Sequence, residues 1–365
     1  MSTEILIADP LTPSSARVRY VSEGKRVDSQ RESHPRDAAH ELADGPDDAD
    51  GAGQGRGQDA EAAAPTTTPA VAATRPSLFS DYIQLTKPRI VTMILVTTVA
   101  SAMIAAGGWI ATLDMLWLLM GTAMVAGSAG AANQIWERRI DCNMTRTASR
   151  PLPAERVKLL PAILYTAALV VIGTAILVWQ FGYAPALAGV ATWLLYVLVY
   201  TPMKTRTAWN TTVGAVAGAL PVLMGYTAAG GGIGDWTGWL LVAVLAAWQY
   251  PHFMAIAWLY RRQYGEAGFC MSTTVDPSGR SAGAQSIAGS IAILGCSVAL
   301  CVIPGGSIPG TIIASVAAIF ACYPMLRASI RFSATPDDVM ARKLLRSSLL
   351  VLPAVLAIVT VRTVL

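Results

Sequence analysis

The sequence predicts an all-α integral membrane protein, built as a bundle of nine transmembrane helices. Of its 365 residues, 53% are hydrophobic and only 14% are charged, and the mean hydropathy is +0.48. Such a chain is too apolar for an ordinary soluble domain. Its apolar residues gather in long runs, and the loops between them alternate between basic loops and loops without Lys or Arg. Inside a lipid bilayer, such long runs satisfy their backbone hydrogen bonds by forming helices, so a helical bundle is expected.

Nine apolar stretches follow one another from residue 90 onward. Each has about 17 to 22 residues, the length that a helix needs to cross about 30 Å of hydrocarbon. The predicted spans are residues 90–107, 113–133, 159–179, 184–200, 211–230, 237–257, 284–303, 308–326 and 345–363.

The loop charges predict the orientation of the bundle. Loops that contain Arg138 to Lys158, Lys204 and Arg206, Arg261 to Arg280, and Arg327 to Arg346 are basic, whereas the other four hold no Lys or Arg. Of the 19 basic residues after residue 80, all but Arg362 fall on one side. Since positive loops stay in the cytoplasm, we expect a cytoplasmic N-terminus and a C-terminus outside.

The first 80 residues differ from the rest of the chain. They hold 13 of the 23 acids but only eight of the 27 basic residues, with much Ala, Gly, Pro and Thr. A segment of this composition cannot build a core, so we expect a disordered cytoplasmic tail over residues 1–80 and a membrane domain over residues 81–365. The five cysteines show no CxxC spacing and indicate neither a disulfide framework nor a zinc site.

Three polar residues recur at the end of the second span. Asn133, Glu137 and Asp141 are spaced four apart, which on a helix places them along one face. Mg²⁺ takes oxygen ligands and is usually held by one or two carboxylates together with substrate phosphates. We call Asn133, Glu137 and Asp141 the acid stripe. Arg146 and Arg150 follow it closely in the sequence, and the two groups together suit the binding of a metal-bridged diphosphate. The alternative is an ordinary set of charges at a membrane interface.

Two more polar segments lie on the same side. "YTPMKTRTAWN" contains Lys204 and Arg206. These two residues either bind an anion or reflect only the usual excess of positive charge in cytoplasmic loops. "WQYPHFMAIAWLYRRQYGEAGFCM" contains His252, the one histidine after residue 80, among several aromatic residues. A histidine there is either packed in the bundle or in contact with a ligand. The aromatic rings either form an interfacial belt or stabilise a carbocation.

Three segments resemble the UbiA superfamily of intramembrane prenyltransferases. They are "NQIWERRIDCNMTRTASRPLP", "YTPMKTRTAWNTTVGAVAGALPVLMGYTA" and "WQYPHFMAIAWLYRRQYGEAGFCM". The first marks the superfamily, while "YTPMK" and "WQYPHF" are similar to its haem-farnesylating branch. The resemblance covers about residues 80 to 365 and implies a nine-helix bundle of the UbiA type.

The resemblance also implies a reaction. Farnesyl diphosphate ionises with Mg²⁺ as cofactor, its farnesyl carbon joins a vinyl group of haem b, and water supplies a hydroxyl to give haem O for terminal oxidases. It implies a multi-pass protein of the bacterial cytoplasmic (inner) membrane, with the lipid bilayer as a partner and a haem A synthase acting downstream. No nucleic-acid partner is expected.

Individual residues take their roles from the same resemblance. It implies catalytic roles for Asn133, Glu137, Asp141 and Lys204, with the first three as Mg²⁺ ligands. It implies substrate binding by Arg138, Arg146, Arg150, Arg206, Asn210, His252 and Tyr264.

The chain departs from the pattern at Gln263, where relatives often carry Asp before a tyrosine and a glycine. A neutral amide does not balance the charge of a metal. Either this loop contributes less to the metal site, or Glu266 substitutes as a second-site ligand.

Three other classes of protein share some of these features. A UbiA enzyme acting on a quinone precursor would keep the acid stripe but not "WQYPHF". A transporter or channel would more naturally place charges at the midplane of several spans, whereas here they gather on one side. A non-catalytic haem-binding membrane protein would need neither the acid stripe nor its arginines.

Overall fold

The structure, a computed structural model, describes residues 77–303, 305 and 307–364. Among these residues, nine helical segments are long and apolar enough to cross a membrane. The predicted fold class is therefore confirmed. The predicted tail lies outside the described residues apart from residues 77–80, which begin a short helix that the hydropathy pattern does not predict, α1 (Leu78–Leu85).

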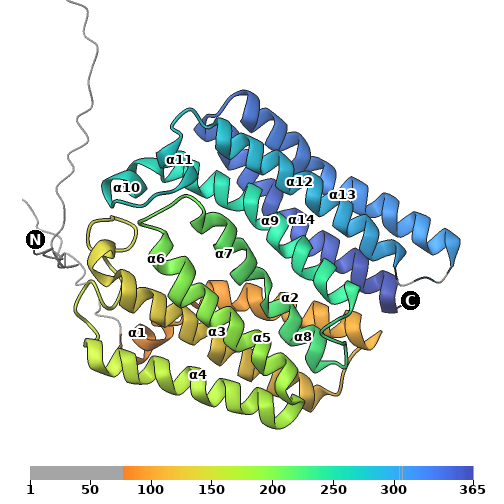
Figure 1. Cartoon of the computed structure of the whole chain (residues 1–365), viewed down its shortest axis with the longest axis horizontal. Coiled ribbons are helices and arrows are strands. Elements are labelled where there is room, and N and C mark those ends of the chain that lie inside the picture. Colours follow the sequence, from red (N-terminus) through yellow and green to blue (C-terminus); the bar gives the residue numbers. More distant parts are fainter. Residues whose placement is uncertain (1–76, 304, 306, 365) are drawn as a thin grey trace, which may run out of the picture. The chain divides into compact units, whose positions relative to one another are not determined.

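The nine spans follow the predicted order along the chain (Figure 1). They are α2 (Pro88–Ala106), α3 (Thr112–Asp141), α4 (Leu159–Phe181), α5 (Tyr183–Leu194) continued by a π-helical turn η1 (Leu195–Tyr200) and α6 (Thr201–Met203), α7 (Asn210–Ala219) with α8 (Pro221–Ala228), α9 (Trp236–Leu259), α12 (Arg280–Val302), α13 (Ile308–Ala334) and α14 (Asp338–Val364). Two short helices, α10 (Arg261–Glu266) and α11 (Ser272–Val275), lie between α9 and α12.

Three helices run well past their predicted ends. Helix α3 continues from residue 133 to Asp141, α13 continues from 326 to Ala334, and α14 starts at Asp338 rather than at 345. The added turns are polar and charged, so hydropathy stops short of them. A helix continues there because its backbone hydrogen bonds do not depend on apolar side chains. In α3, this extension keeps Asn133, Glu137 and Asp141 on one continuous helix, as their spacing predicts.

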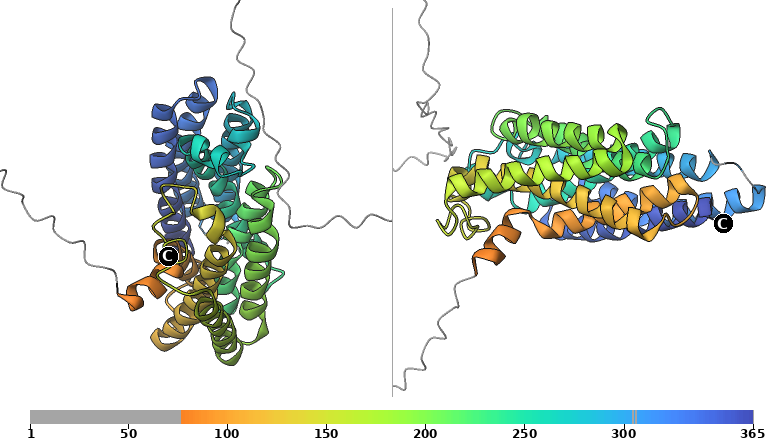
Figure 2. Two further views of the ribbon diagram at one scale, coloured as in Figure 1. Left: turned by 90° about the vertical axis from the view of Figure 1, so that its left-hand side faces the viewer. Right: turned by 90° about the horizontal axis from the view of Figure 1, so that it is seen from below.

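The spans pack as neighbours in chain order and then close on themselves. Helix α3 packs between α2 and α4, α5 packs on α4 and α8, and α9, α12, α13 and α14 follow in turn. Helix α14 then packs against both α9 and α2, which brings the last span back to the first. Figure 2 shows the helices side by side with roughly aligned axes. Polar side chains held between α2, α3, η1, α7 and α9 are thus enclosed by other spans.

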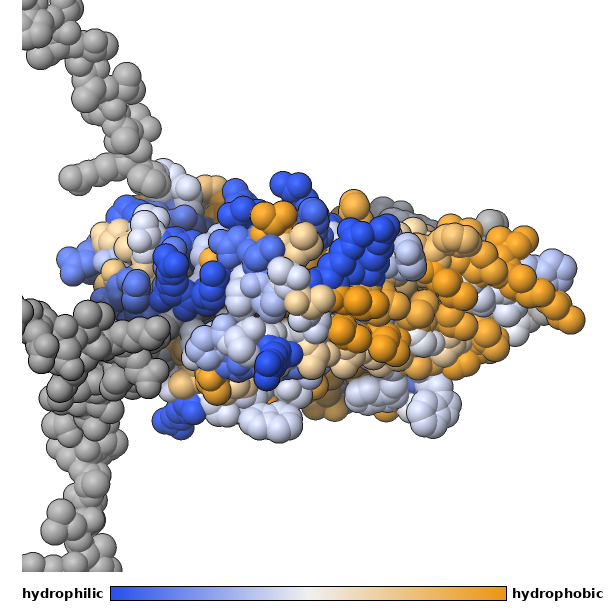
Figure 3. Space-filling model, turned by 90° about the horizontal axis from the view of Figure 1, so that it is seen from above, coloured by the Kyte–Doolittle hydropathy of each residue, from blue (hydrophilic) through white to orange (hydrophobic). Residues whose placement is uncertain are grey.

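Charged loops gather at one end of the helices, which we call the basic end. It carries the turn at 142–158, α10 and α11, while the loops at the opposite end are short and hold no Lys or Arg. Hydrophilic residues gather at the basic end of the surface drawn in Figure 3, and most of the other end is hydrophobic. Arg362 is the basic residue of the membrane domain that lies at the opposite end. It donates hydrogen bonds to the Gly305 carbonyl and to Thr311 Oγ1, and so connects α14 to the loop before α13 and to the start of α13.

Helix α1 is docked on the basic end by buried polar contacts. Gln134 Nε2 donates to the carbonyls of Gln84 and Leu85, both at 3.0 Å. Arg156 Nε donates to Asp81 Oδ1 at 2.9 Å. These contacts hold the turn between α1 and α2 against α3, and that turn carries Lys87.

Candidate active site

A cavity of about 510 Å³, which we call the central cavity, is lined by residues of α2, α3, α5, η1, α7, α8, α9, α10 and α14. Its polar part includes Lys87, Asn133, Glu137, Asp141, Arg146, Arg150, Lys204, Asn210 and Tyr264, and its apolar part includes Ile90, Met93, Ile94, Val125, Met224, Leu245, Phe253, Ile256 and Leu352. Its volume lies within the range of small-molecule pockets, about 300 to 1,000 Å³. One cavity therefore joins a charged end to an apolar interior.

The acid stripe forms the polar wall of this cavity. Asn133 and Asp141 are fully buried, and Glu137 is 5% exposed. Each reaches a different cation: Asn133 Oδ1 accepts from Lys87 Nζ, Glu137 Oε1 accepts from Lys204 Nζ at 2.7 Å, and Asp141 Oδ2 accepts from Arg150 Nη1 at 2.7 Å. Buried charges need such partners. The stripe is thus a row of buried side chains that each contact a cation, rather than a solvated helix face.

Lys204 is positioned by an irregular stretch of its span. The π turn η1 precedes it, and Thr201 Oγ1 donates to the carbonyl of Tyr196 at 2.8 Å. The Lys204 Nζ lies 4.6 Å from the centre of the Tyr200 ring, which itself packs where Gly214 leaves no Cβ in the way. Burial alone would lower the pKa of Lys204, but the Glu137 carboxylate outweighs burial and raises it. Lys204 is therefore held as a cation.

Lys87 is a site residue that the sequence motifs did not predict, because it counted there only as a basic residue before the first span. It precedes Pro88 with φ of 56°, a left-handed conformation that is rare for a residue with a side chain. The turn lies directly on α3, where a Cβ on Gly130 would approach the Thr86 carbonyl oxygen to 3.0 Å. Burial lowers the pKa of Lys87. A lysine beside a proline at a helix start, on the same side as the acid stripe, was the available clue.

Arg146 joins two segments at the mouth of the cavity. Its Nη2 donates to Tyr264 Oη at 3.2 Å, and its guanidinium lies 4.7 Å from the centre of the Tyr260 ring. Both tyrosines lie at or beside α10, whereas Arg146 lies in the turn after α3. The predicted Arg146 and Tyr264 are thus brought together.

Asn210 anchors the loop that follows Lys204. Its Nδ2 donates to the carbonyl oxygens of Thr207 at 2.6 Å and Cys270 at 2.8 Å. The backbone N–H of Cys270 also donates to the Lys204 carbonyl at 2.7 Å. Asn210 lines the cavity, but the structure shows its amide holding the segment in place.

Three predicted site residues do not line the central cavity: Arg138, Arg206 and Glu266. Arg138 Nη1 donates to the Ile135 carbonyl on its own helix, and Arg206 and Glu266 are exposed. Gln263 is also absent from the lining. Glu266, one of the two alternatives for the acid missing at Gln263, is exposed and does not line the central cavity.

The stripe fits a single divalent cation shared with a substrate. Among the described residues, no group of three or more His, Cys, Asp or Glu side chains is arranged to hold a metal alone. However, Asp141 Oδ1 is buried without a hydrogen-bond partner in the described part of the chain. Mg²⁺ is usually bound by one or two carboxylates plus substrate phosphates. Asp141 and Glu137, with Asn133, fit that ligand set.

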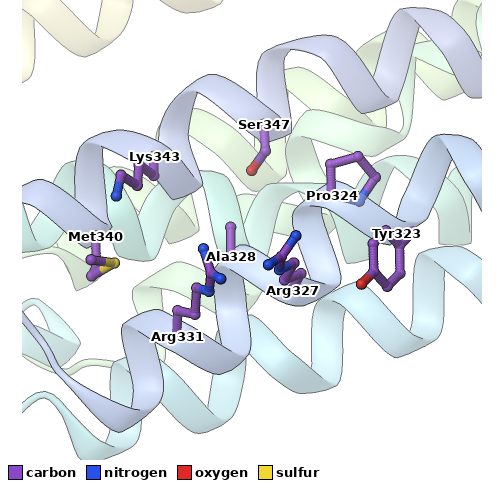
Figure 4. Close-up of a pocket in the computed structure, with 8 residues that line it drawn as sticks. All are labelled: Tyr323, Pro324, Arg327, Ala328, Arg331, Met340, Lys343 and Ser347. Atoms are coloured by element: carbon purple, nitrogen blue, oxygen red, sulfur yellow. The ribbon is translucent and has the colours of Figure 1, made fainter.

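A second pocket of about 260 Å³ lies between α13 and α14 (Figure 4). We call it the α13–α14 pocket. Its lining includes three exposed cations, Arg327, Arg331 and Lys343, and no acidic residue.

Comparison with known proteins decides the family. A model of the UbiA prenyltransferase family matches residues 94–350. The chain belongs to this family. It is 60% identical over 283 residues to the protoheme IX farnesyltransferase of Rhodopirellula baltica, which covers 77% of this chain and 99% of that relative. It is 37% identical over 281 residues to the Salinibacter ruber protein of the same name, with 77% and 98% covered.

Solved structures share the fold, UbiA homologs among them. A structure reported for digeranylgeranylglyceryl phosphate synthase matches with a TM-score of 0.66 at 15% identity, over 78% of this chain and 98% of that one. A UbiA homolog from Archaeoglobus fulgidus, bound to DMAPP and Mg²⁺, matches with a TM-score of 0.56 at 15% identity, over 77% and 99%. The predicted bundle of the UbiA type is confirmed.

Proposed function

We propose that this protein transfers the farnesyl group of farnesyl diphosphate to a vinyl group of haem b, giving haem O. The observation that carries the proposal is the acid stripe paired with buried cations at the charged end of an apolar cavity. The relatives named protoheme IX farnesyltransferase match nearly their whole length. The similarity to these relatives supports haem b as the acceptor. The geometry of the acid stripe and its cations supports the diphosphate site.

The cations of the cavity stabilise the departing diphosphate. Lys204 and Arg150 lie at 2.7 Å from carboxylates on one face of α3, and Lys87 reaches the first residue of that face. Donors fixed in a water-poor site favour charge that develops as a bond breaks. Arg146 stands at the mouth, where Tyr260 and Tyr264 orient its guanidinium. These four side chains therefore bind and orient the diphosphate end of the substrate.

We assign the cofactor Mg²⁺ to Glu137, Asp141 and Asn133. When bound, Mg²⁺ would neutralise diphosphate charge as a Lewis acid. The chain's own contribution is to keep three oxygen-bearing side chains on consecutive turns of one helix and to hold them with cations that lie ready for phosphate oxygens.

The apolar walls hold the farnesyl chain and exclude water. Aromatic rings of Trp193, Tyr196, Tyr200, Trp248 and Phe253 line the cavity. Such rings stabilise a nearby cation by about 0.5 to 2 kcal/mol each. An allylic cation formed there is shielded from early attack by water.

The test is product formation in membranes that carry the protein. We expect membranes incubated with haem b, farnesyl diphosphate and Mg²⁺ to yield a pigment with the mass of haem O, and a chelator to abolish it. A prenylated aromatic quinone precursor without haem O would favour the alternative UbiA activity. Haem bound without any product would favour a non-catalytic haem protein.

We infer that the basic end faces the cytoplasm, because positive loops remain there. Reporters fused after residue 232 should then appear outside, and reporters fused after residue 275 inside. The reverse pattern would contradict the orientation. We also propose that residues 1–76 are a cytoplasmic tail that the reaction does not require.

A further inference from the structure

His252 is held rigidly against the central cavity. It lies on α9, seven residues before Leu259 at the basic end of that helix, or about 10 Å deep along the axis. Its ring stacks on Trp248 with centroids 4.6 Å apart and planes 22° apart. Trp248 is itself fixed, since its Nε1 donates to the Ser348 carbonyl at 2.6 Å. This stacking favours one plane for the imidazole ring.

A hydrogen-bond chain on α14 meets one ring nitrogen of His252. His252 Nδ1 lies 3.0 Å from Ser348 Oγ, and Ser348 is fully buried on α14. Ser348 Oγ donates its single proton to the Leu345 carbonyl at 2.8 Å. The hydroxyl oxygen then has only lone pairs for the imidazole. In this arrangement Nδ1–H donates to Ser348 Oγ, and Nε2 of that neutral tautomer carries the lone pair.

The lone pair on Nε2 is available to a ligand. Nε2 has no hydrogen-bond partner among the described residues. It is not one of the fully buried polar atoms that lack a partner, so it remains accessible. Because His252 lines the cavity, a ligand there meets a basic nitrogen on a fixed ring. Neutral imidazole is the commonest metal ligand in proteins, and its other N–H is usually fixed by an acceptor, as Ser348 does here.

We propose that His252 Nε2 is an axial ligand to the iron of haem b and so positions the acceptor for prenylation. The inference rests on the proposed function for the identity of the acceptor. Mg²⁺ prefers oxygen ligands, whereas imidazole suits iron. The coordinate bond uses the Nε2 lone pair and releases no proton, because the ring is already neutral. The bond would hold the porphyrin in the central cavity, and so would restrict where its vinyl groups lie.

The test is the iron–histidine stretching band of ferrous haem b in resonance Raman spectra. The full-length protein in lipid nanodiscs is loaded with haem b in the absence of farnesyl diphosphate. We expect the band in the wild type, its loss in His252→Ala with haem affinity reduced about 100-fold, and its return when imidazole is added. Ser348→Ala should retain the band at a shifted frequency, with an affinity loss of about tenfold, because the Nδ1 acceptor is gone.

Two control variants show whether the band depends on His252 rather than on a histidine outside the bundle or on the acid stripe. The double variant His34→Ala/His40→Ala removes the other two histidines of the chain and should keep the band. Asp141→Asn should also keep it while product formation collapses. An unchanged band in His252→Ala, or wild-type haem without a nitrogen ligand, would overturn the proposal. A normal band together with no haem O under turnover conditions would contradict the proposed function and leave the ligand assignment standing.

Discussion

The central cavity and the α13–α14 pocket lie at the same end of the bundle, and cations line both of them. In the central cavity, Lys204 and Arg150 are paired with carboxylates that are 5% exposed or less. In the α13–α14 pocket, Arg327, Arg331 and Lys343 are exposed and no acid lines the wall. The proposed orientation of the basic end accounts for the second arrangement by itself, because basic residues collect on the cytoplasmic side of membrane proteins.

The difference lies in what each arrangement costs the folded protein. Exposed cations at a membrane edge keep most of their hydration. A buried carboxylate loses its hydration, and the attraction within a buried ion pair is often smaller than the cost of this desolvation. A buried acid such as Asp141, whose Oδ1 has no hydrogen-bond partner among the described residues, therefore indicates a ligand more strongly than a larger number of surface cations. We expect substitutions in the two regions to differ accordingly.

The largest effect is expected from Asp141→Asn. This change keeps the shape but removes the charge of the carboxylate that holds Arg150, whose other oxygen is buried without a partner in the part of the chain that the structure describes. Loss of one metal-linked carboxylate should slow haem O formation by roughly 100-fold or more, which corresponds to about 2.7 kcal/mol of barrier. Pigment mass analysis across a Mg²⁺ titration measures it.

Asp114→Asn is the matched control for that change. Asp114 lies in the first turn of the same helix, at the opposite end, where its Oδ1 accepts from Gln180 Nε2 at 2.7 Å. Its substitution should leave the rate nearly unchanged. Equal rates in wild type and Asp141→Asn at every Mg²⁺ concentration would show that the stripe is only a charged helix end.

The sequence predicts this contrast only in part. Hydropathy and loop charge define the nine spans, and the spacing of Asn133, Glu137 and Asp141 defines one buried face, because both follow from helix periodicity. Arg138 does not line the central cavity, because the next residue on a helix points about 100° away from Glu137. The roles of Lys87 and Arg206 depend on turn conformation and tertiary packing, which no periodicity encodes.

An intermediate effect is expected from Lys204→Met. It removes the partner of Glu137 from a pair whose side chains are 14% and 6% exposed. A charged hydrogen bond worth about 2 kcal/mol corresponds to a rate loss of roughly 30-fold. The uncompensated carboxylate should also lower the free energy of unfolding by about 3 kcal/mol.

A double variant tests the pairing itself. Lys204→Met/Glu137→Gln removes both charges, so thermal stability should largely return while activity stays low. Thermal unfolding in detergent measures the first, and haem O formation the second. If the double variant is as unstable as the sum of the two single variants, the two side chains are not coupled.

A smaller effect is expected from Lys87→Met. Lys87 contacts Asn133, a neutral group, so its loss leaves no carboxylate unpaired. We expect the KM for farnesyl diphosphate to rise about tenfold, near the lower limit for a charged hydrogen bond, with a smaller change in kcat. Lys158→Met, an exposed lysine at the same end, should change neither. An unchanged KM in Lys87→Met would limit Lys87 to holding the turn before α2.

The smallest effect is expected from removing the cations of the α13–α14 pocket. The triple variant Arg327→Gln, Arg331→Gln, Lys343→Gln takes three charges from the basic end, more than any change above. These side chains are exposed, line a separate pocket and contact none of the acid stripe, so haem O formation should stay within about twofold of the wild type at equal membrane abundance. Correct insertion must be verified with the reporter fusions, because the same charges contribute to topology. A loss of tenfold or more in correctly inserted protein would mean that the number of cations at this end matters more than their burial.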